Sequence, residues 1–334
     1  MIADQPRTLK IGSLELANPL ILAPLSGISD LPFRLLAKEQ GCALVCTEMI
    51  SAEGLLHNRR AAERLLQSRP EEAPLAVQIF GSRSGSMGEA ARIIEDYGAD
   101  VLDINMGCPV RKVVRGGSGA ALLKDLERAR EIIQAVRKAI SIPLTIKIRS
   151  GWDEKSLNFL DVGRLAEDLG VDALTLHGRT RNQGYGIKAD WEVMGRAKAQ
   201  LHIPVIGNGD LNSPEAVIDF FSRTGCAGAM IGRGALGNPW IFRQALNVLQ
   251  GQPCREPSLE EKEDTILRHM RMMVERRGEV HGVKEFRKHL IWYTKGLRGC
   301  TDFRSRIPLW NTVSEMAGGI HEYFKNLQHP PLFS

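Results

Sequence analysis

Short apolar runs alternate with amphipathic segments along most of the chain. Eight runs rich in Val, Ile and Leu stand at residues 19–25, 42–49, 73–81, 100–107, 142–151, 172–180, 203–210 and 227–234. Runs of this length and composition are typical of strands buried on both faces. Segments with helical periodicity lie between them at residues 88–98, 126–140, 159–170 and 213–225. Several of these segments end on a glycine, which suits a helix C-cap.

This alternation predicts an α/β fold, namely a (β/α)8 TIM barrel over residues 1–250, because such barrels typically take about 250 residues. An open doubly wound sheet is the alternative, but no G-x-G-x-x-G follows the first apolar run. The pattern changes after residue 250, where a linker runs into a helix that begins with Ser258 and Glu261 in the spacing of a capping box. No strand pattern returns, so we expect a small all-helical C-terminal domain at residues 257–334.

The composition is that of an ordinary globular protein, with 43% hydrophobic and 25% charged residues among 334. The net charge of +5 permits a polyanionic partner without requiring one. Six scattered cysteines without metal-ligand spacing argue against a zinc site and a disulfide scaffold. Neither a signal peptide nor a membrane-spanning run is recognisable. We expect a cytoplasmic protein with no metal, no membrane association and no obligate protein partner.

The predicted helical tail is rich in basic residues, with histidine and aromatic residues interleaved. Two interpretations stay open on composition alone, a solvated helix surface and a phosphate-binding face for a nucleic acid. The basic residues are Arg268, Arg271, Arg276, Arg277, Lys284, Arg287, Lys288, Lys295, Arg298, Arg304 and Arg306.

Polar residues gather where the apolar runs end, and in a barrel these ends share the mouth that holds active sites. They are Ser26, Glu48, Gln78, Asn105, Lys147, Arg149, His177, Asn208, Asp210 and Arg233. Glycines at the last two run ends, Gly209 and Gly232, favour a phosphate site built from backbone N–H groups. Arg233 adds a cation that can grip a phosphate with two hydrogen bonds.

Gln78 and Lys147 suit a flavin, because an amide can meet the pyrimidine edge and a cation can stabilise the reduced ring. The alternative for Lys147 is a salt bridge with a neighbouring carboxylate. A single histidine such as His177 is more often a satisfied buried residue than a catalytic one. With Arg179 and Arg181 close behind it, phosphate or substrate contact becomes the better interpretation.

Cys108 follows a glycine at the end of a strand-like run, beside Asn105. A thiol with an unperturbed pKa near 8.5 is mostly protonated at neutral pH. The position therefore suits a general acid that protonates one carbon of a C=C bond while hydride reaches the other. Asn105 is placed to hydrogen-bond an amide-like substrate edge.

Nine segments occur in the order found in one known family. They are APLSGISDLPFR from Ala23, TEM from Thr47, VQIFG, DINMGCP, GSGAALL, IKIRSGW, LHGRTR, NGD and GRGALGNPWIF. Together with FRKHLIWY from Phe286, they resemble the tRNA-dihydrouridine synthase family, and most of all its bacterial B-type members. The resemblance covers nearly the whole chain.

The resemblance implies an FMN-dependent oxidoreductase acting on CH–CH groups, which uses NADPH to reduce the C5–C6 bond of specific uridines in tRNA. It implies hydride transfer from flavin N5 to C6, a proton from Cys108 to C5, and a uracil held by Asn105. Other substrate contacts are expected at Arg149, Arg179, Arg287 and Lys288. The expected FMN contacts are Pro24, Leu25, Ser26, Gln78, Lys147, His177, Asn208, Gly209, Asp210, Gly232 and Arg233.

One departure is visible, because the family usually has APMAG where this chain has APLSG. Leu replaces Met with little change of volume and Ser26 is small, so we expect the FMN contact to survive. A small-molecule FMN barrel reductase of the dihydroorotate dehydrogenase or ene-reductase type is the alternative function. A non-catalytic RNA-binding protein on a retired barrel is the third possibility, and the complete set of Cys108, Asn105, Gln78 and Lys147 argues against it.

Overall fold

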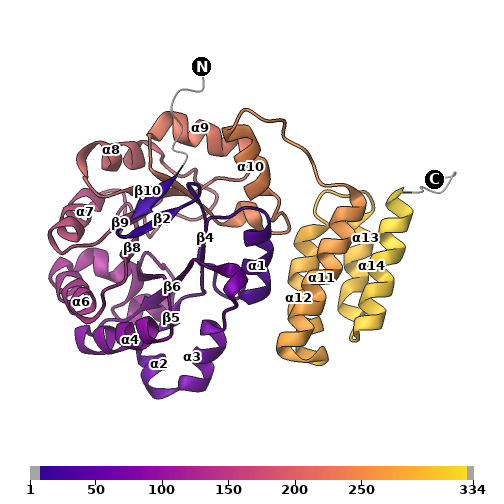
Figure 1. Ribbon diagram of the computed structural model, residues 1–334, viewed down its shortest axis with the longest axis horizontal. Coiled ribbons are helices and arrows are strands. Elements are labelled where there is room, and N and C mark those ends of the chain that lie inside the picture. Colours follow the sequence, from indigo (N-terminus) through magenta and orange to yellow (C-terminus); the bar gives the residue numbers. More distant parts are fainter. Residues whose placement is uncertain (1–7, 329–334) are drawn as a thin grey trace.

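The computed structural model describes residues 8–328, except for the side chains of residues 59–61, as a barrel followed by a helical bundle (Figure 1). Each predicted apolar run contains one barrel strand. The strands are β3 (Leu20–Leu22), β4 (Leu44–Cys46), β6 (Leu75–Phe80), β7 (Val101–Met106), β8 (Leu144–Arg149), β9 (Ala173–His177), β10 (Val205–Asn208) and β11 (Gly228–Ile231). All pair in parallel, and β4 pairs with both β3 and β6, which closes the ring. The TIM-barrel prediction is confirmed.

Helices cover the outside of the barrel (Figure 1). The four predicted helical segments are found, and the one at residues 213–225 ends on Gly225 with φ of 60°, the left-handed C-cap that its sequence indicates. A short strand, β5 (Ile50–Ser51), continues the sheet beside β6. The helices are α1 (Leu31–Glu39), α2 (Ala52–His57), α3 (Arg59–Leu66), α4 (Ser84–Asp96), α5 (Arg111–Arg115), α6 (Leu126–Ala139), α7 (Phe159–Asp168), α8 (Glu192–Gln200), α9 (Pro214–Thr224) and α10 (Ile241–Leu249).

A hairpin that the sequence patterns did not reveal packs against the barrel interior. It consists of β1 (Leu9–Ile11) and β2 (Leu14–Leu16), paired antiparallel. Leu9 and its neighbours join a buried cluster with interior side chains such as Ile206 and Met230. Leu9 lies against Gly228, the first residue of β11, so the hairpin covers the end of the barrel opposite the polar strand ends.

The bundle contains α11 (Leu259–Arg277), α12 (Glu279–Tyr293), α13 (Cys300–Arg306) and α14 (Val313–Gln328). No strand occurs in the described part of this segment, which ends at residue 328, as the sequence predicts. Ser258 caps α11 by accepting a hydrogen bond from the Glu261 backbone N–H at 3.1 Å. The predicted capping box is only half formed, because the Glu261 carboxylate accepts from Arg243 instead. Residues 1–7 and 329–334, the outer ends of the two predicted domains, lie outside the described residues.

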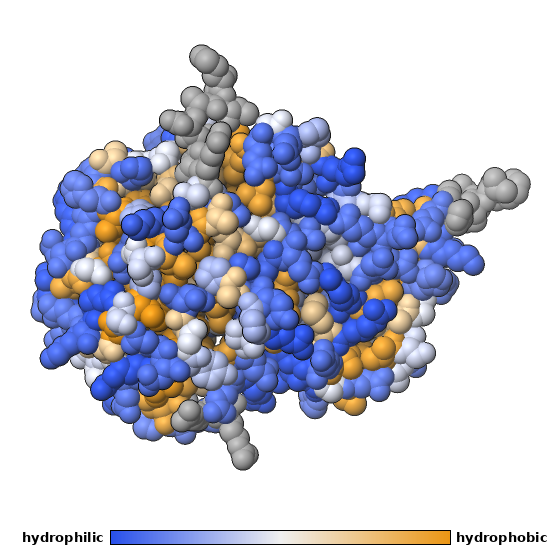
Figure 2. Space-filling model, in the orientation of Figure 1, coloured by the Kyte–Doolittle hydropathy of each residue, from blue (hydrophilic) through white to orange (hydrophobic). Residues whose placement is uncertain are grey.

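The surface in the view of Figure 2 is mainly hydrophilic, and apolar side chains show only in separate patches. Within residues 8–328, no helix combines the length and the apolarity needed to cross a bilayer.

The barrel and the bundle share buried side chains. Trp240, which precedes α10, belongs to the apolar core of the bundle together with Phe286 and Leu290 of α12. From the barrel side, the Phe33 ring of α1 lies 5.8 Å from the His289 ring, centroid to centroid. The junction is therefore part of the bundle core rather than a solvated contact.

Polar contacts and one close backbone approach define this junction. Arg276 of α11 is largely buried and donates to the Asp30 carboxylate at 3.1 Å. Lys288 of α12 donates to the Gly27 carbonyl oxygen in the loop between β3 and α1. Gly237 has φ of 65°, and a Cβ atom there would lie 2.3 Å from the Trp292 carbonyl carbon. A side chain at residue 237 would therefore push α12 away from the barrel.

We predict that Gly237→Ala destabilises the protein more than Gly251→Ala does. Both glycines have left-handed φ, but a Cβ at Gly251 would meet nothing within 4 Å. Both variants bear the strain of a left-handed alanine, and only Gly237→Ala adds an overpacked contact, worth about 1–3 kcal/mol. Chemical denaturation of the full chain measures the difference, and equal losses in the two variants would contradict the close approach.

Candidate functional site

A cavity of about 550 Å³ opens at the carboxyl ends of the barrel strands. Its walls come from the loops that follow β3, β7, β9, β10 and β11 and from side chains at the strand ends. The lining residues are Ala23, Pro24, Leu25, Ser26, Ile28, Met49, Gln78, Asn105, Gly107, Cys108, Pro109, Val110, Lys147, Arg149, His177, Tyr185, Asn208, Gly209, Asp210, Leu211, Asn212, Gly232, Arg233 and Leu236.

The strand register brings polar side chains to the same level in this cavity. Asn105 of β7 is the partner of Lys147 on β8. His177 of β9 is the partner of Arg149 on one side and of Asn208 on the other. Because the strands are parallel, side chains at paired positions stand next to one another at one end of the barrel.

A chain of amide hydrogen bonds leads from a buried carboxylate to Cys108. Asp103 accepts from the Gln78 side-chain amide at 2.6 Å and from the Thr145 hydroxyl at 2.6 Å. Gln78 in turn accepts from the Asn105 amide at 2.8 Å. The Asn105 side-chain oxygen then accepts from the Cys108 backbone N–H at 2.9 Å. Asp103 thereby fixes which way both amides point, because a carboxylate can only accept here.

The Cys108 thiol is half-buried at the cavity wall. Burial raises its pKa above the ordinary value for a thiol, although the Val110 backbone and Arg149 act in the other direction. A Cβ atom at Gly107 would lie 3.2 Å from the Ile148 carbonyl carbon, so glycine lets this loop rest on β8. Cys108 is therefore a protonated thiol at neutral pH, held by a tightly packed turn.

Lys147 is half-buried and has no carboxylate partner within the described chain. Its ammonium donates to the Asn208 side-chain oxygen at 2.9 Å. Burial, and next the charge of Arg149, lowers its pKa to about 8. The salt bridge that was the alternative for this residue is absent from residues 8–328, and the charge faces the cavity.

The neighbouring His177 ring is kept neutral. Burial lowers its pKa to about 2, and the charge of Lys147 acts in the same direction. The His177 Nδ1 atom is buried with no hydrogen-bond partner. Buried polar atoms are rarely left unpaired, so this wall is suited to a bound polar group.

Asp210 ties two arginines together at the edge of the cavity. Its carboxylate accepts from Arg179 at 2.7 Å and from Arg233 at 2.9 Å. Burial acts to raise the Asp210 pKa. Hydrogen bonds from Arg179 and Ala189 outweigh this effect together with the charges of the two arginines, so the pKa lies below its ordinary value. The guanidinium of Arg233 also lies 4.0 Å from the centroid of the exposed Tyr185 ring.

Residues 21–328 match the family described as dihydrouridine synthase (Dus). A probable tRNA-dihydrouridine synthase of Rickettsia bellii is 38% identical over 321 residues, which cover 96% of this chain and 98% of that protein. The tRNA-dihydrouridine synthase B of Pseudomonas putida is 39% identical over 319 residues, which cover 95% of this chain and 94% of that protein.

The chain belongs to the dihydrouridine synthase family.

Solved structures with the same fold are much more distant. A complex of 2-naphthoyl-CoA reductase has a TM-score of 0.55 at 13% identity and covers 76% of this chain and 53% of its own. A variant of NCR from Zymomonas mobilis has a TM-score of 0.53 at 14% identity and covers 77% of this chain and 94% of its own. These likenesses concern the barrel fold alone.

Most of the side chains that the sequence singled out in this dihydrouridine synthase lie around one cavity. Glu48 is the exception among the strand-end residues, since it lies outside the cavity lining and accepts a hydrogen bond from the Gly27 backbone N–H. Arg179, which follows β9, also lies behind the wall, where it is buried and bound to Asp210. Arg149 lines the cavity but donates to the Gly107 and Thr180 carbonyl oxygens.

Besides Arg179, two predicted substrate residues lie outside the cavity. Arg287 donates to the Trp310 carbonyl oxygen at 2.8 Å, within the bundle. Lys288 donates to Gly27, at the junction with the barrel. Both side chains thus hold parts of the protein together.

Sequence reasoning missed Asp103, Thr145 and Tyr185. Asp103 had a recognisable signal, because it is an acid inside an otherwise apolar strand run. Tyr185 stands in a loop with glycine on both sides. Nothing in its local sequence indicates that its ring packs on Arg233.

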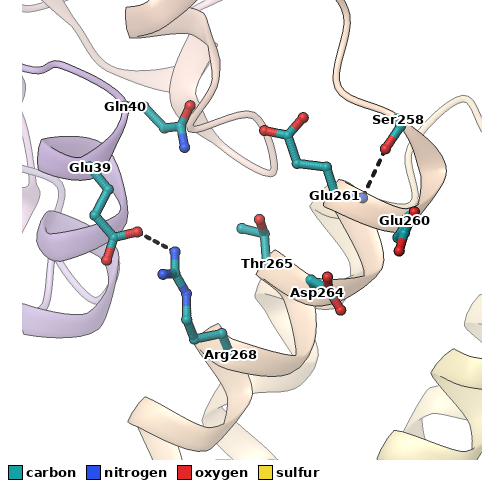
Figure 3. A pocket seen from close by; sticks show the side chains of 8 residues that line it. All are labelled: Glu39, Gln40, Ser258, Glu260, Glu261, Asp264, Thr265 and Arg268. Carbon is teal, nitrogen blue, oxygen red and sulfur yellow. Dashed lines mark hydrogen bonds and ion pairs between the residues drawn. The ribbon is translucent and has the colours of Figure 1, made fainter.

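A second cavity, of about 500 Å³, lies between α1 and α11 (Figure 3). Four carboxylates line it, and its one arginine, Arg268, pairs with Glu39. Such a site repels phosphate groups. Within residues 8–328, no group of three or more His, Cys, Asp or Glu residues is arranged to hold a metal ion.

We predict that Asp103→Leu makes the Cys108 thiol react faster, whereas Thr145→Val does not. The first change leaves the Gln78 amide without its acceptor and releases the chain of amides that supports the Cys108 backbone. The second removes a hydrogen bond from the same carboxylate but leaves the chain of amides intact. Losing one hydrogen bond of about 1.4 kcal/mol corresponds to about a tenfold change in rate.

Alkylation of the folded protein, followed by mass spectrometry of the Cys108 peptide, measures this rate. Cys254 is exposed and serves as the internal reference. An equal response of Cys108 in both variants would show that Asp103 does not support the loop through Gln78.

Proposed function

We propose that this chain is a tRNA-dihydrouridine synthase, which reduces the C5–C6 double bond of uridines in tRNA with FMN as cofactor and NADPH as reductant. The observation that carries the proposal is the Cys108 thiol, held protonated at the wall of a cavity, with a lysine charge that has no carboxylate partner on the neighbouring strand. The family membership and the names of the relatives agree with this chemistry.

The residues present fit FMN. The cavity wall has cationic side chains in excess, with Lys147, Arg149 and Arg233 against the single carboxylate of Asp210. Arg233 uses one of its terminal nitrogens for Asp210 and keeps its other N–H groups for a phosphate. The unpaired His177 Nδ1 atom offers a further polar contact.

We assign FMN contacts to the two ends of this wall. Pro24, Leu25 and Ser26 would pack against the flavin ring, with Gln78, Lys147 and His177 at its polar edge. Asn208, Gly209, Asp210, Gly232 and Arg233 would hold the ribityl chain and the phosphate. When bound, the flavin supplies the hydride that uridine needs at C6.

The protein's own part in the reaction is to orient the base and supply a proton. The Cys108 thiol donates its proton to C5 of the uracil. The Asn105 amide has one N–H directed at the Met49 sulfur, 3.9 Å away. Sulfur is a weak acceptor, so a uracil carbonyl can replace it and be held beside the thiol. The uridine has to leave its stack to reach this depth.

We further propose a division of labour along the chain. The barrel, residues 8–250 of the described chain, carries the chemistry. The bundle, residues 257–328, takes part in binding the RNA. The bundle has no role in the alternative function, reduction of a small molecule by a flavin barrel, so RNA dependence separates the two.

The first experiment is a visible spectrum of the purified protein with NADPH, recorded with and without tRNA that lacks dihydrouridine. We expect a yellow protein that NADPH bleaches and that regains its colour anaerobically only with tRNA. A yellow protein whose colour is indifferent to tRNA would instead support the small-molecule reductase.

We predict that Cys108→Ala keeps FMN and its reduction by NADPH but loses tRNA reduction by about 10²–10⁴-fold, the usual worth of a positioned proton donor. Single-turnover kinetics of the prereduced protein with tRNA measures the loss. The matched control is Cys254→Ala at an exposed cysteine, which should behave as the wild type. An unchanged rate in Cys108→Ala would remove the thiol from the reaction.

We predict that FMN binds more weakly as the pH rises through about 8. Lys147 in the free protein has a pKa of about 8. It is cationic below that pH and uncharged above it, so an anionic ligand loses an attraction there. Titration of the apoprotein with FMN across this range measures the affinity, and Lys147→Met should bind weakly without a step near pH 8. A step that persists in this variant would assign the titration to another group.

A further inference from the structure

The basic residues of the bundle are mostly engaged within the protein. Four of those singled out in the sequence pair with carboxylates, namely Arg268, Arg276, Arg277 and Arg306. Another four donate to carbonyl oxygens, namely Arg287, Lys288, Arg298 and Arg304. Among the described residues, only Arg271, Lys284 and Lys295 of that set have no side-chain partner. The number of basic residues in the bundle is therefore larger than the number of side chains that are free to bind a polyanion.

Free cations occur instead on the barrel, directly after the Cys108 loop. The side chains of Arg111, Lys112 and Arg115 on α5 are exposed and have no hydrogen-bond or ion-pair partner within residues 8–328. From Ile104 to Lys124 the chain carries four cations and no carboxylate. Val110, which lines the cavity, is 55% exposed at the foot of this segment.

This cationic segment continues around the mouth of the cavity. α5 packs on the 3-10 turn at Gly119–Lys124, and the Ala120 backbone N–H donates to the Cys108 carbonyl oxygen. The Lys124 ammonium lies 4.8 Å from the centroid of the Trp152 ring. The Arg181 guanidinium lies 4.6 Å from the same centroid. Both are favourable cation–π contacts, which hold the two charges in place without neutralising them.

The segment lies across the cavity from the bundle. The bundle meets the barrel at α1 and at Gly237, which follow β3 and β11. In the closed order of the strands, β7 and β8 stand opposite β3 and β11. Figure 1 shows α6, the next helix after α5, on the side of the barrel away from the bundle. The reacting Cys108 thus lies between the two surfaces.

We propose that Arg111, Lys112 and Arg115 form a phosphate-binding rim that holds the RNA backbone on the side of the cavity away from the bundle. The proposal rests on the proposed function, since it names a surface for the same substrate. An RNA chain that places one base beside Cys108 has to continue past the mouth of the cavity in both directions. Lys and Arg side chains bind backbone phosphates and release their counterions, and exposed cations without a carboxylate partner are available for this contact. Lys124 and Arg181 extend the rim toward the loops after β8 and β9.

The test compares two triple variants with the same change of charge. The rim variant is Arg111→Gln, Lys112→Gln and Arg115→Gln. The control variant is Lys10→Gln, Arg92→Gln and Lys138→Gln, which removes three exposed cations, likewise without described partners, from β1, α4 and α6. The measurements are tRNA affinity over a series of salt concentrations, FMN content, and the dependence of flavin bleaching on NADPH concentration without RNA.

We expect the rim variant to bind tRNA more weakly and to lose about 0.9 from the slope of log K against log salt for each phosphate contact removed. The control variant should keep the slope of the wild type, and both should keep FMN and the NADPH dependence. An unchanged slope in the rim variant would overturn the proposal. Equal losses in both variants would also overturn it, since they would reflect net charge rather than a site.

Two further results have distinct meanings. A higher KM for NADPH in the rim variant, with an unchanged RNA slope, would assign the three cations to the phosphates of the reductant and overturn the RNA rim. Failure of the wild type itself to bind tRNA would refute the proposed function, and the rim with it.

Discussion

The parallel register of the barrel strands is the constraint on which the site depends. It sets Asn105 beside Lys147 and His177 between Arg149 and Asn208, at the one end of the barrel where strands give way to loops. A shift of one strand by a single residue would turn its polar end away from the cavity and its apolar residues toward it. The apolar packing that fixes the register therefore also fixes the chemistry.

Much of this arrangement could be predicted from the sequence, because it follows from local patterns. The strands are short apolar runs, and their ends carry polar residues, so barrel and mouth follow together. Gly107 and Cys108 interrupt an apolar run that would otherwise continue as a buried strand, and so mark the end of that strand. The order of the nine motifs predicted the dihydrouridine synthase family, and the comparisons confirm it.

What could not be predicted depends on pairing between distant parts of the chain. The hairpin at residues 9–16 has strands of three residues, too short for a periodic signal, and gains its stability from the barrel interior. Asp103 orients Asn105 only through Gln78, which belongs to another strand. Arg276 looks like a free cation in the sequence, but its partner Asp30 lies 246 positions away. Most of the basic residues that the sequence shows in the bundle therefore bind to groups within the protein.

The shared core between barrel and bundle has a consequence for substrate selection. Because Trp240 is embedded among bundle side chains and Gly237 lies against the α12 backbone, the bundle cannot swing to follow a ligand. If barrel and bundle both contact the RNA as proposed, the distance between these two surfaces is fixed, and bending or unstacking would occur in the RNA. Selection between RNAs then rests on how easily each one deforms at the target base, and a loop that is already open has an advantage that no base-specific contact needs to supply.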